Sequence, residues 1–422
     1  MKRLSIAFAG FLLAGAGLLI GSCSSDNPAP LNDRELCDSF KDPGAQWCGK
    51  PFWAWNGRLE KDELLRQLGL FQEMGMGGVF MHSRVGLQTE YLGEQWFDLT
   101  NAVADSAARM GLDAYLYDED RWPSGTAGGM VTRDHPELRM NFVELFTLPA
   151  EEFRWDSDSI VAAFACNLDG VDYSDLVRLS RDSDPSQYKG KTILKFLHRT
   201  RSCTDVYNGG TYLDVFNPEA TQKFMSLTHE KYKEHCGERL GREIKGIFTD
   251  EPHRGGLFTD FDGNPDGVGN NPRTAPWTPR MAEEYHARFG GDLVADLPKL
   301  FLRENGRRIN DVKWKYCELA ESLFLKNFAK PQYDWCTENG IAYTGHVLHE
   351  DNLTSQVTMQ GSLMRYYEYM HIPGMDMLTE GARPYWAAKQ LASVGRQLGK
   401  KWLLSETYGV TGWQFDFRGH KA

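Results

Sequence analysis

Three glutamates in the sequence each lie directly after a predicted strand. They are Glu251, Glu350 and Glu406. Two carboxylates that face one cavity can cleave a glycosidic bond, one as a protonated acid and the other as an ionised base or nucleophile. The sequence therefore indicates glycoside hydrolysis, with structural carboxylates at strand ends as the alternative.

A segment rich in acids and aromatic residues, 117–125 (YDEDRWPSG), follows another predicted strand. Asp118 and Glu119 can hydrogen-bond to vicinal sugar hydroxyls while the Trp122 indole stacks on the ring. A purely structural loop is the alternative. The other predicted sugar contacts are His346, Trp55, His82 and Trp413.

Two patterns raise the question of a metal, although no ligand set is assigned. His346 and His349 form an H-x-x-H pair beside carboxylates, and with His82 they support a metal-dependent hydrolase of another class as a third hypothesis. Residues 260–266 (DFDGNPD) alternate oxygen ligands as a calcium loop does, but Pro265 stands where such a loop needs glycine. A solvated loop is favoured there, with calcium as the alternative.

The elements that must position these residues alternate between strands and helices. Strands are predicted at 52–56, 78–82, 114–118, 245–250, 341–347, 375–378 and 402–405, and helices at 60–74, 95–110, 218–235, 280–289, 312–338 and 385–398. Repeated βα units favour a parallel sheet in a (β/α)8 barrel, whose catalytic groups lie at the carboxyl ends of the strands. A doubly wound open sheet is the alternative, but no G-x-G-x-x-G follows the first strand.

Two features modify the predicted barrel. Residues 138–213 contain β-type runs divided by Asp, Ser and Pro, which indicates a small inserted β subdomain. After the seventh strand only residues 408–422 remain, too few for an eighth βα unit. We therefore expect residues 50–422 to form an incomplete, seven-stranded catalytic barrel.

The N-terminal residues are predicted to be a targeting segment. Lys2 and Arg3 precede an apolar run that ends in Leu-Ile-Gly-Ser-Cys, similar to the lipobox of bacterial lipoproteins. Residues 1–22 are then a signal peptide, Cys23 bears the lipid, and 23–49 are a tether and N-terminal segment. This predicts a bacterial cell-envelope protein, lipid-anchored at the outer membrane and facing the periplasm or the surface. An ordinary secretory signal or a membrane anchor is the alternative.

Composition excludes several classes of function. The chain has 422 residues, 47 Lys and Arg against 58 Asp and Glu, and a formal charge of −11. Without a concentrated basic run, nucleic acid is not an expected partner. The sequence also contains no G-x-S-x-G and no P-loop, so serine-esterase and nucleotide-hydrolysing chemistry lack support.

Five motifs, in order, resemble the bacterial glycosidases related to the α-L-rhamnosidases of glycoside hydrolase family 106. The motifs are residues 51–57 (PFWAWNG), 77–79 (GGV), 117–125, 344–346 (TGH) and 405–409 (SETYG). The resemblance covers about residues 50–415. It implies a (β/α)8 catalytic domain, an inverting mechanism, calcium beside the sugar and β-sandwich domains after the barrel. The Trp-Pro-Ser-Gly stretch departs from typical rhamnosidases, which leaves the sugar open.

The resemblance also implies roles for the three glutamates. Glu251 matches the general acid, and Glu350 matches the spacing of the base along the chain. Glu406 occupies a strand-seven position that many barrel glycosidases use, so it is the alternative base. We rank Glu350 first, with Glu406 then binding sugar or metal.

Two hypotheses of function follow. The first is a glycosidase that removes terminal rhamnose-like or related sugars from polysaccharides by acid/base catalysis. The second is a non-catalytic carbohydrate-binding lipoprotein, a barrel remnant that keeps its aromatic contacts without turnover. Both take a carbohydrate partner and a membrane contact through lipid, and neither requires a cofactor other than the calcium that the resemblance implies.

Overall fold

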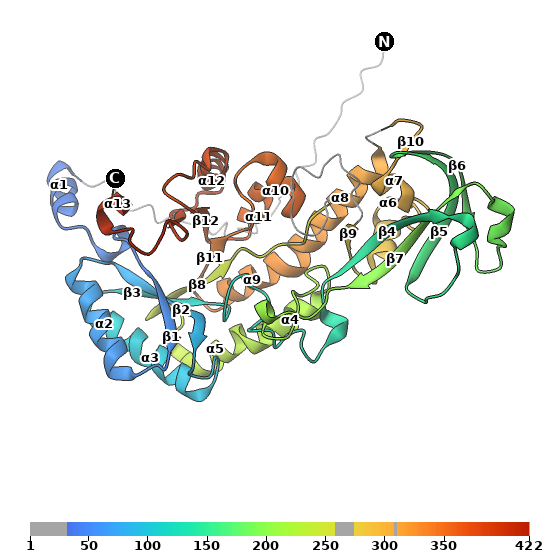
Figure 1. The fold of residues 1–422 in the computed structure, drawn as a ribbon. Coiled ribbons are helices and arrows are strands. Elements are labelled where there is room, and N and C mark those ends of the chain that lie inside the picture. The colour runs from blue at the N-terminus through green and yellow to red at the C-terminus, as the bar shows by residue number, and fades with distance from the viewer. Residues whose placement is uncertain (1–31, 258–273, 308–309, 422) are drawn as a thin grey trace, which may run out of the picture. The chain divides into compact units, whose positions relative to one another are not determined.

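Seven parallel strands form the central sheet of the computed structural model, which describes residues 32–257, 274–307 and 310–421 (Figure 1). In order across the sheet they are β1 (Phe52–Gly57), β2 (Gly78–Leu87), β3 (Asp113–Tyr117), β8 (Ile244–Asp250), β11 (Ala342–His346), β12 (Ile372–Met377) and β13 (Leu404–Thr407). The strands of this sheet lie side by side in the order in which they occur along the chain, as in a barrel. In a doubly wound sheet, the strand order would reverse at a switch point. The sheet curls into a partial barrel. The barrel class is confirmed, and the doubly wound alternative is wrong.

Helices connect these strands and pack against the sheet. They are α2 (Lys61–Glu73), α3 (Glu94–Arg109), α4 (Pro218–Leu227), α5 (His229–Cys236), α8 (Asp311–Phe324), α9 (Lys330–Glu338), α10 (Leu353–Met359), α11 (Leu363–Tyr367) and α12 (Tyr385–Leu398), and a short helix, α13 (Phe417–Lys421), follows β13. The helix predicted at 218–235 is two helices that meet at Thr228, and α10 and α11 were not predicted. A π-helical turn, Leu325–Ala329, joins α8 to α9.

The interior of the partial barrel is aromatic. Phe80, Tyr117 and Phe248 are buried there, and the Phe52 ring lies 4.7 Å from the Phe248 ring, centroid to centroid. Because side chains alternate along a strand, every second residue of β2 faces this interior. These aromatic rings fill part of the barrel interior.

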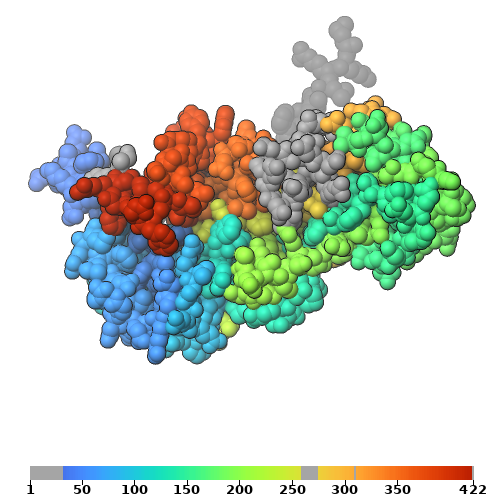
Figure 2. Space-filling view, in the orientation of Figure 1, coloured from blue at the N-terminus to red at the C-terminus, as the bar shows by residue number. Residues whose placement is uncertain are grey.

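A second, mixed sheet forms a separate β subdomain. Its order is β10 (Arg303–Glu304), β6 (Asp172–Leu179), β5 (Ile160–Asp169), β7 (Thr192–Thr200), β4 (Asn141–Pro149) and β9 (Thr274–Trp277). Helices α6 (Met281–Phe289) and α7 (Leu297–Phe301) lie between β9 and β10 in the chain. β10 pairs with β6, although the two strands are far apart in the sequence. Orange and green segments accordingly lie side by side in Figure 2.

The predicted insertion at 138–213 accounts for β4 to β7 only. Strands β9 and β10 come from a later segment, in which the sequence analysis predicted no strand. Both are short, and β9 contains Pro276, which fits its position at the edge of the sheet. Short edge strands with proline give no alternating pattern, and so the prediction missed them.

Helix α1 (Asp33–Lys41) belongs to a separate structural unit that ends at Gly44. The Asn32 side chain begins it by accepting hydrogen bonds from the backbone N–H groups of Arg34 and Glu35. None of the helices in the described part of the chain has the length and apolar character to cross a membrane. The predicted signal peptide and Cys23 lie outside the described residues.

Candidate active site

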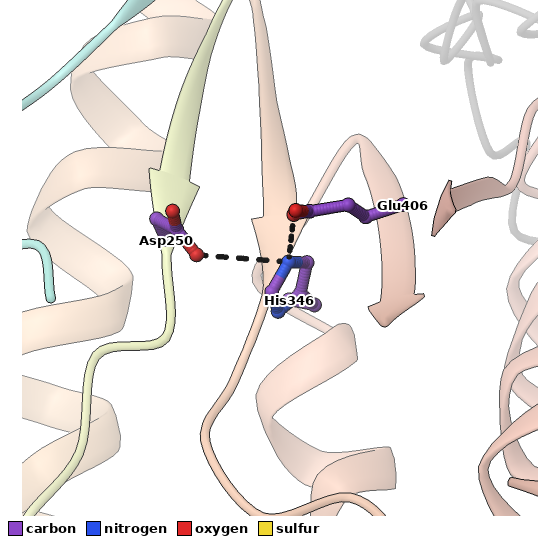
Figure 3. A group of neighbouring side chains, drawn as sticks. All are labelled: Asp250, His346 and Glu406. Atoms are coloured by element: carbon purple, nitrogen blue, oxygen red, sulfur yellow. Dashed lines mark hydrogen bonds and ion pairs between the residues drawn. The ribbon is translucent and has the colours of Figure 1, made fainter. Parts of the chain in front are cut away.

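Three strands of the barrel bring polar side chains together at their carboxyl ends. β8 ends at Asp250, β11 ends at His346, and β13 contributes Glu406 (Figure 3). His346 is the register partner of Asp250, and the preceding Gly345 makes this close pairing feasible. A Cβ at Gly345 would lie 1.9 Å from the carbonyl oxygen of Thr249 on β8. Any larger residue there would push the two strands apart.

His346 links the two carboxylates of this cluster. Its Nε2 atom lies 2.7 Å from Glu406 Oε2 and 3.7 Å from Asp250 Oδ1, and the Tyr117 hydroxyl donates to Asp250 Oδ2 at 2.6 Å. Burial lowers the pKa of His346, but the hydrogen bond to Glu406 and the two negative charges outweigh it. The pKa therefore lies well above its ordinary value. His346 is therefore placed to orient Glu406 through this hydrogen bond.

Glu251 turns away from the line of β8. Its backbone adopts a left-handed φ of 49°, and its N–H donates to the carbonyl of His346 at 3.2 Å. For a residue with a side chain this conformation costs of order 1–3 kcal/mol, and it is found most often at functional sites. The carboxylate accepts a hydrogen bond from the indole N–H of Trp122, whose ring is 42% exposed.

The environment of Glu251 favours its protonated form. Burial raises the pKa of the carboxyl to about 8, against the opposing effects of the His346 charge and the Trp122 hydrogen bond. A carboxylic acid with this pKa keeps its proton at neutral pH and can donate it. Glu251 therefore has the property that a general acid requires.

A pocket of about 500 Å³ opens over these groups. Six carboxylates line it, those of Asp250, Glu251, Glu350, Asp351, Asp376 and Glu406. The other lining residues are Arg84, Trp122, Leu348, His349, Leu378, Gly409 and Val410. All three predicted catalytic glutamates and Trp122 thus lie around one cavity of a size suited to a small ligand.

Glu350 lines this pocket, but its oxygens are engaged with the protein. It is 5% exposed and accepts hydrogen bonds from the N–H of Asp376 at 2.8 Å, the N–H of Val347 at 3.3 Å and the Tyr367 hydroxyl at 3.4 Å. Burial raises its pKa to about 7. Glu350 thereby ties the end of β11 to β12, whereas Glu406 makes one side-chain contact in the described structure, to His346.

The acids of the segment after β3 face the protein interior. Glu119 is fully buried, and its two oxygens accept hydrogen bonds from the backbone N–H groups of Asp120, Gly125, Thr126, Ala127 and Gly128. Asp118 is also fully buried and accepts a hydrogen bond from the Ser124 hydroxyl. Ser124 Oγ in turn accepts from the N–H of Asp250 at 2.7 Å. These residues hold the loop and the end of β8 in place.

Four further predicted sugar contacts do not line the pocket within the described structure, and one of them is His346, which is 1% exposed. Trp55 is 1% exposed and packs edge-on against Trp53 and Trp96. His82 is buried against Phe52, and burial lowers its pKa to about 3. Trp413 is fully exposed and does not line the pocket.

The sequence analysis did not single out four charged residues of the pocket, Arg84, Asp250, Asp351 and Asp376. A signal for Arg84 was present, because Phe80, His82 and Arg84 alternate along β2 and so share one face of the strand. Asp376 lies within β12, whose residues show no distinctive pattern, and nothing in the sequence singles it out.

The cluster of Asp250, His346 and Glu406 does not by itself fit calcium. The ligand atoms of Asp250, His346 and Glu406 lie within 4.8 Å of one another, but calcium takes six to eight oxygen ligands and this set offers an imidazole nitrogen. The nitrogen that would bind a metal is already hydrogen-bonded to Glu406. The candidate calcium loop at 260–266 lies outside the described residues. We derive no step through a metal.

Comparison with known proteins gives distant glycoside hydrolase relatives. No family model matches the chain. It is 21% identical over 424 residues to a putative beta-glucuronidase of Formosa agariphila, which covers 90% of this chain and 35% of the relative. Its structure matches a rhamnosidase from Novosphingobium sp. PP1Y with a TM-score of 0.58 and 15% identity, covering 88% of this chain and 53% of that one. The chain thus spans about a third to a half of the length of these relatives, and it has a glycoside-hydrolase-like fold.

Proposed function

We propose that this chain is a glycoside hydrolase that removes terminal sugars by acid/base catalysis, with Glu251 as the general acid. The observation that supports this role is the position of Glu251 at the rim of an acidic pocket, where burial raises the pKa of its carboxyl to about 8, with the half-exposed Trp122 ring beside it. The relatives named as a rhamnosidase and a putative beta-glucuronidase support the class of reaction and suggest rhamnosides or uronides as substrates.

Glu406 is the second carboxylate of the proposed mechanism, in place of Glu350, which the sequence analysis ranked first. Glu350 uses its oxygens to join two strands, whereas Glu406 is oriented by His346 at the pocket. A base must keep a free lone pair for water, and the contacts of Glu406 leave one.

The proposed reaction is a single displacement with inversion. Glu251 gives its proton to the glycosidic oxygen, and the bond from that oxygen to the anomeric carbon breaks with its electrons going to the leaving alcohol. Water attacks the anomeric carbon from the opposite face and passes its proton to Glu406.

The protein itself is proposed to act at the cell envelope, as the N-terminal sequence predicts.

The test is a panel of aryl glycosides, including α-L-rhamnosides and β-D-glucuronides, followed by NMR of the first product. We expect hydrolysis of at least one and an inverted anomer. A retained anomer would reassign Glu406 as a covalent nucleophile. Sugar binding without turnover of any glycoside would instead support the non-catalytic alternative.

A further inference from the structure

Arg84 is the one lysine or arginine among the described residues that line the acidic pocket. It lies near the carboxyl end of β2, on the face that Phe80 and His82 present to the barrel interior. Its backbone is held firmly, because Ser83 beside it is buried and donates to Asp120 at 2.7 Å. The position of Arg84 on the rim is therefore fixed by the strand.

The guanidinium of Arg84 has no hydrogen bond or ion pair to any described residue. Six carboxylates line the same pocket, yet those that have partners take them from His346, Trp122, backbone N–H groups and two tyrosine hydroxyls, and not from Arg84. Arg84 is also exposed, so its donors are open to a ligand. Its charge still acts within the pocket, since it opposes the rise in pKa that burial causes at Asp250.

An unpaired arginine in this setting is informative about the ligand. A pocket lined by carboxylates repels an anion, and a neutral sugar needs no cation for binding. A guanidinium offers a planar set of N–H donors that matches a carboxylate or a sulfate through two parallel hydrogen bonds. We propose that Arg84 binds an anionic substituent of the sugar, a carboxylate or a sulfate ester, so that the substrates are glycosides of acidic sugars. This inference rests on the proposed function.

Matched pairs of substrates test the inference and separate the two anions. The carboxylate arm compares 4-nitrophenyl β-D-glucuronide with the β-D-glucoside, and the sulfate arm compares a sulfated 4-nitrophenyl α-L-rhamnoside with the unsulfated one. Each pair is measured with the wild type, Arg84→Met and Arg84→Lys. Arg396→Met, which removes an exposed arginine on α12, is the control.

We expect kcat/KM for the acidic member of one pair to fall by about 10- to 100-fold in Arg84→Met, with partial recovery in Arg84→Lys. The neutral member and the Arg396→Met control should stay within about threefold of the wild type. An equal loss of kcat/KM on the acidic and the neutral member would overturn the inference. Arg84 would then affect the pocket carboxylates and would not bind the anionic substituent.

Calorimetric binding of free D-glucuronic acid, D-glucose, L-rhamnose and its sulfate separates this inference from the proposed function. Binding of an acidic sugar that Arg84→Met abolishes, without turnover of any glycoside, supports the role of Arg84 and contradicts hydrolysis. Turnover of neutral glycosides with no preference that depends on Arg84 overturns the inference and leaves hydrolysis intact. If no acidic sugar binds and none is hydrolysed, the inference is also overturned.

Discussion

Two parts of the barrel rim contain adjacent carboxylates and use them in opposite ways. In the loop after β3, Asp118 and Glu119 point inward and accept hydrogen bonds from the Ser124 hydroxyl and from backbone N–H groups. At the end of β8, Asp250 and Glu251 meet His346, Trp122 and the pocket. The contrast teaches that a dense run of acids does not by itself identify a catalytic site. What differs is where the carboxylates lie, since Asp250 and Glu251 line the pocket and Asp118 and Glu119 do not.

The largest effect on turnover should come from the β8 side of this comparison. Glu251→Gln removes the proton donor and keeps the shape of the side chain, so we expect hydrolysis of a substrate with a poor leaving group to fall by about 10²–10⁴-fold. An activated aryl substrate, whose leaving group departs without protonation, should lose far less. The measurement is kcat/KM on both substrates, and near-normal rates on the poor one would remove Glu251 from the role.

The β3 side should respond in stability instead. Glu119→Gln replaces one acceptor oxygen by an amide that faces buried N–H donors, and we expect a loss of about 3 kcal/mol in the free energy of unfolding. Urea unfolding measures it. Glu137→Gln, at an exposed glutamate, is the control and should change stability by less than about 0.5 kcal/mol. A stable Glu119→Gln protein with weakened sugar binding would show that Glu119 acts on substrate.

Sequence patterns predicted the seven strands of the barrel, but not α10, α11, β9 or β10. β8 and β11 end within one residue of the predicted positions, whereas β13 continues two residues beyond, so that Glu406 lies inside the strand. Glu251, Glu350 and Glu406 nevertheless line one pocket. The direction of each side chain was not accessible in the same way. Glu119 points inward because five backbone N–H groups converge on it, and that convergence depends on the path of a loop that follows no periodicity.

The same limit applies to two residues whose predicted roles depend on contacts within the fold, Trp55 and Glu350. Trp55 lies on the outer face of β1, where it packs against Trp96 of α3, because alternation along the strand assigns it to the helix-covered side. Glu350 reaches the pocket, but its role depends on the N–H of Asp376, a residue that is distant in sequence. Tertiary contacts of this kind are invisible before the fold is known.

A smaller effect on the β8 side should follow from the loss of the residue that orients Glu406. His346→Gln keeps a donor to Glu406 but removes a positive charge that lowers the pKa of Glu251. We expect kcat/KM to fall by about tenfold, because Glu406 would be oriented less well; the loss of a residue that orients a functional group typically costs about 10- to 100-fold. The alkaline limb of the pH profile should also move to higher pH. A loss of rate with an unchanged pH profile would show a structural role alone.

The smallest effect should come from the contact that joins the two regions, since Trp122 in the β3 loop donates to Glu251 after β8. The acid works while protonated, so activity on a poor leaving group should fall as pH rises through about 8, the pKa of Glu251. The indole N–H stabilises the ionised carboxylate and thus holds this pKa down. Trp122→Phe keeps an aromatic ring and removes the donor, so the pKa should rise and the limb should move to higher pH, by less than in His346→Gln. The pH dependence of kcat/KM measures the shift. A limb that moves to lower pH would mean that the hydrogen bond from Trp122 favours the protonated acid. The β3 loop would then raise the pKa of Glu251 instead of lowering it.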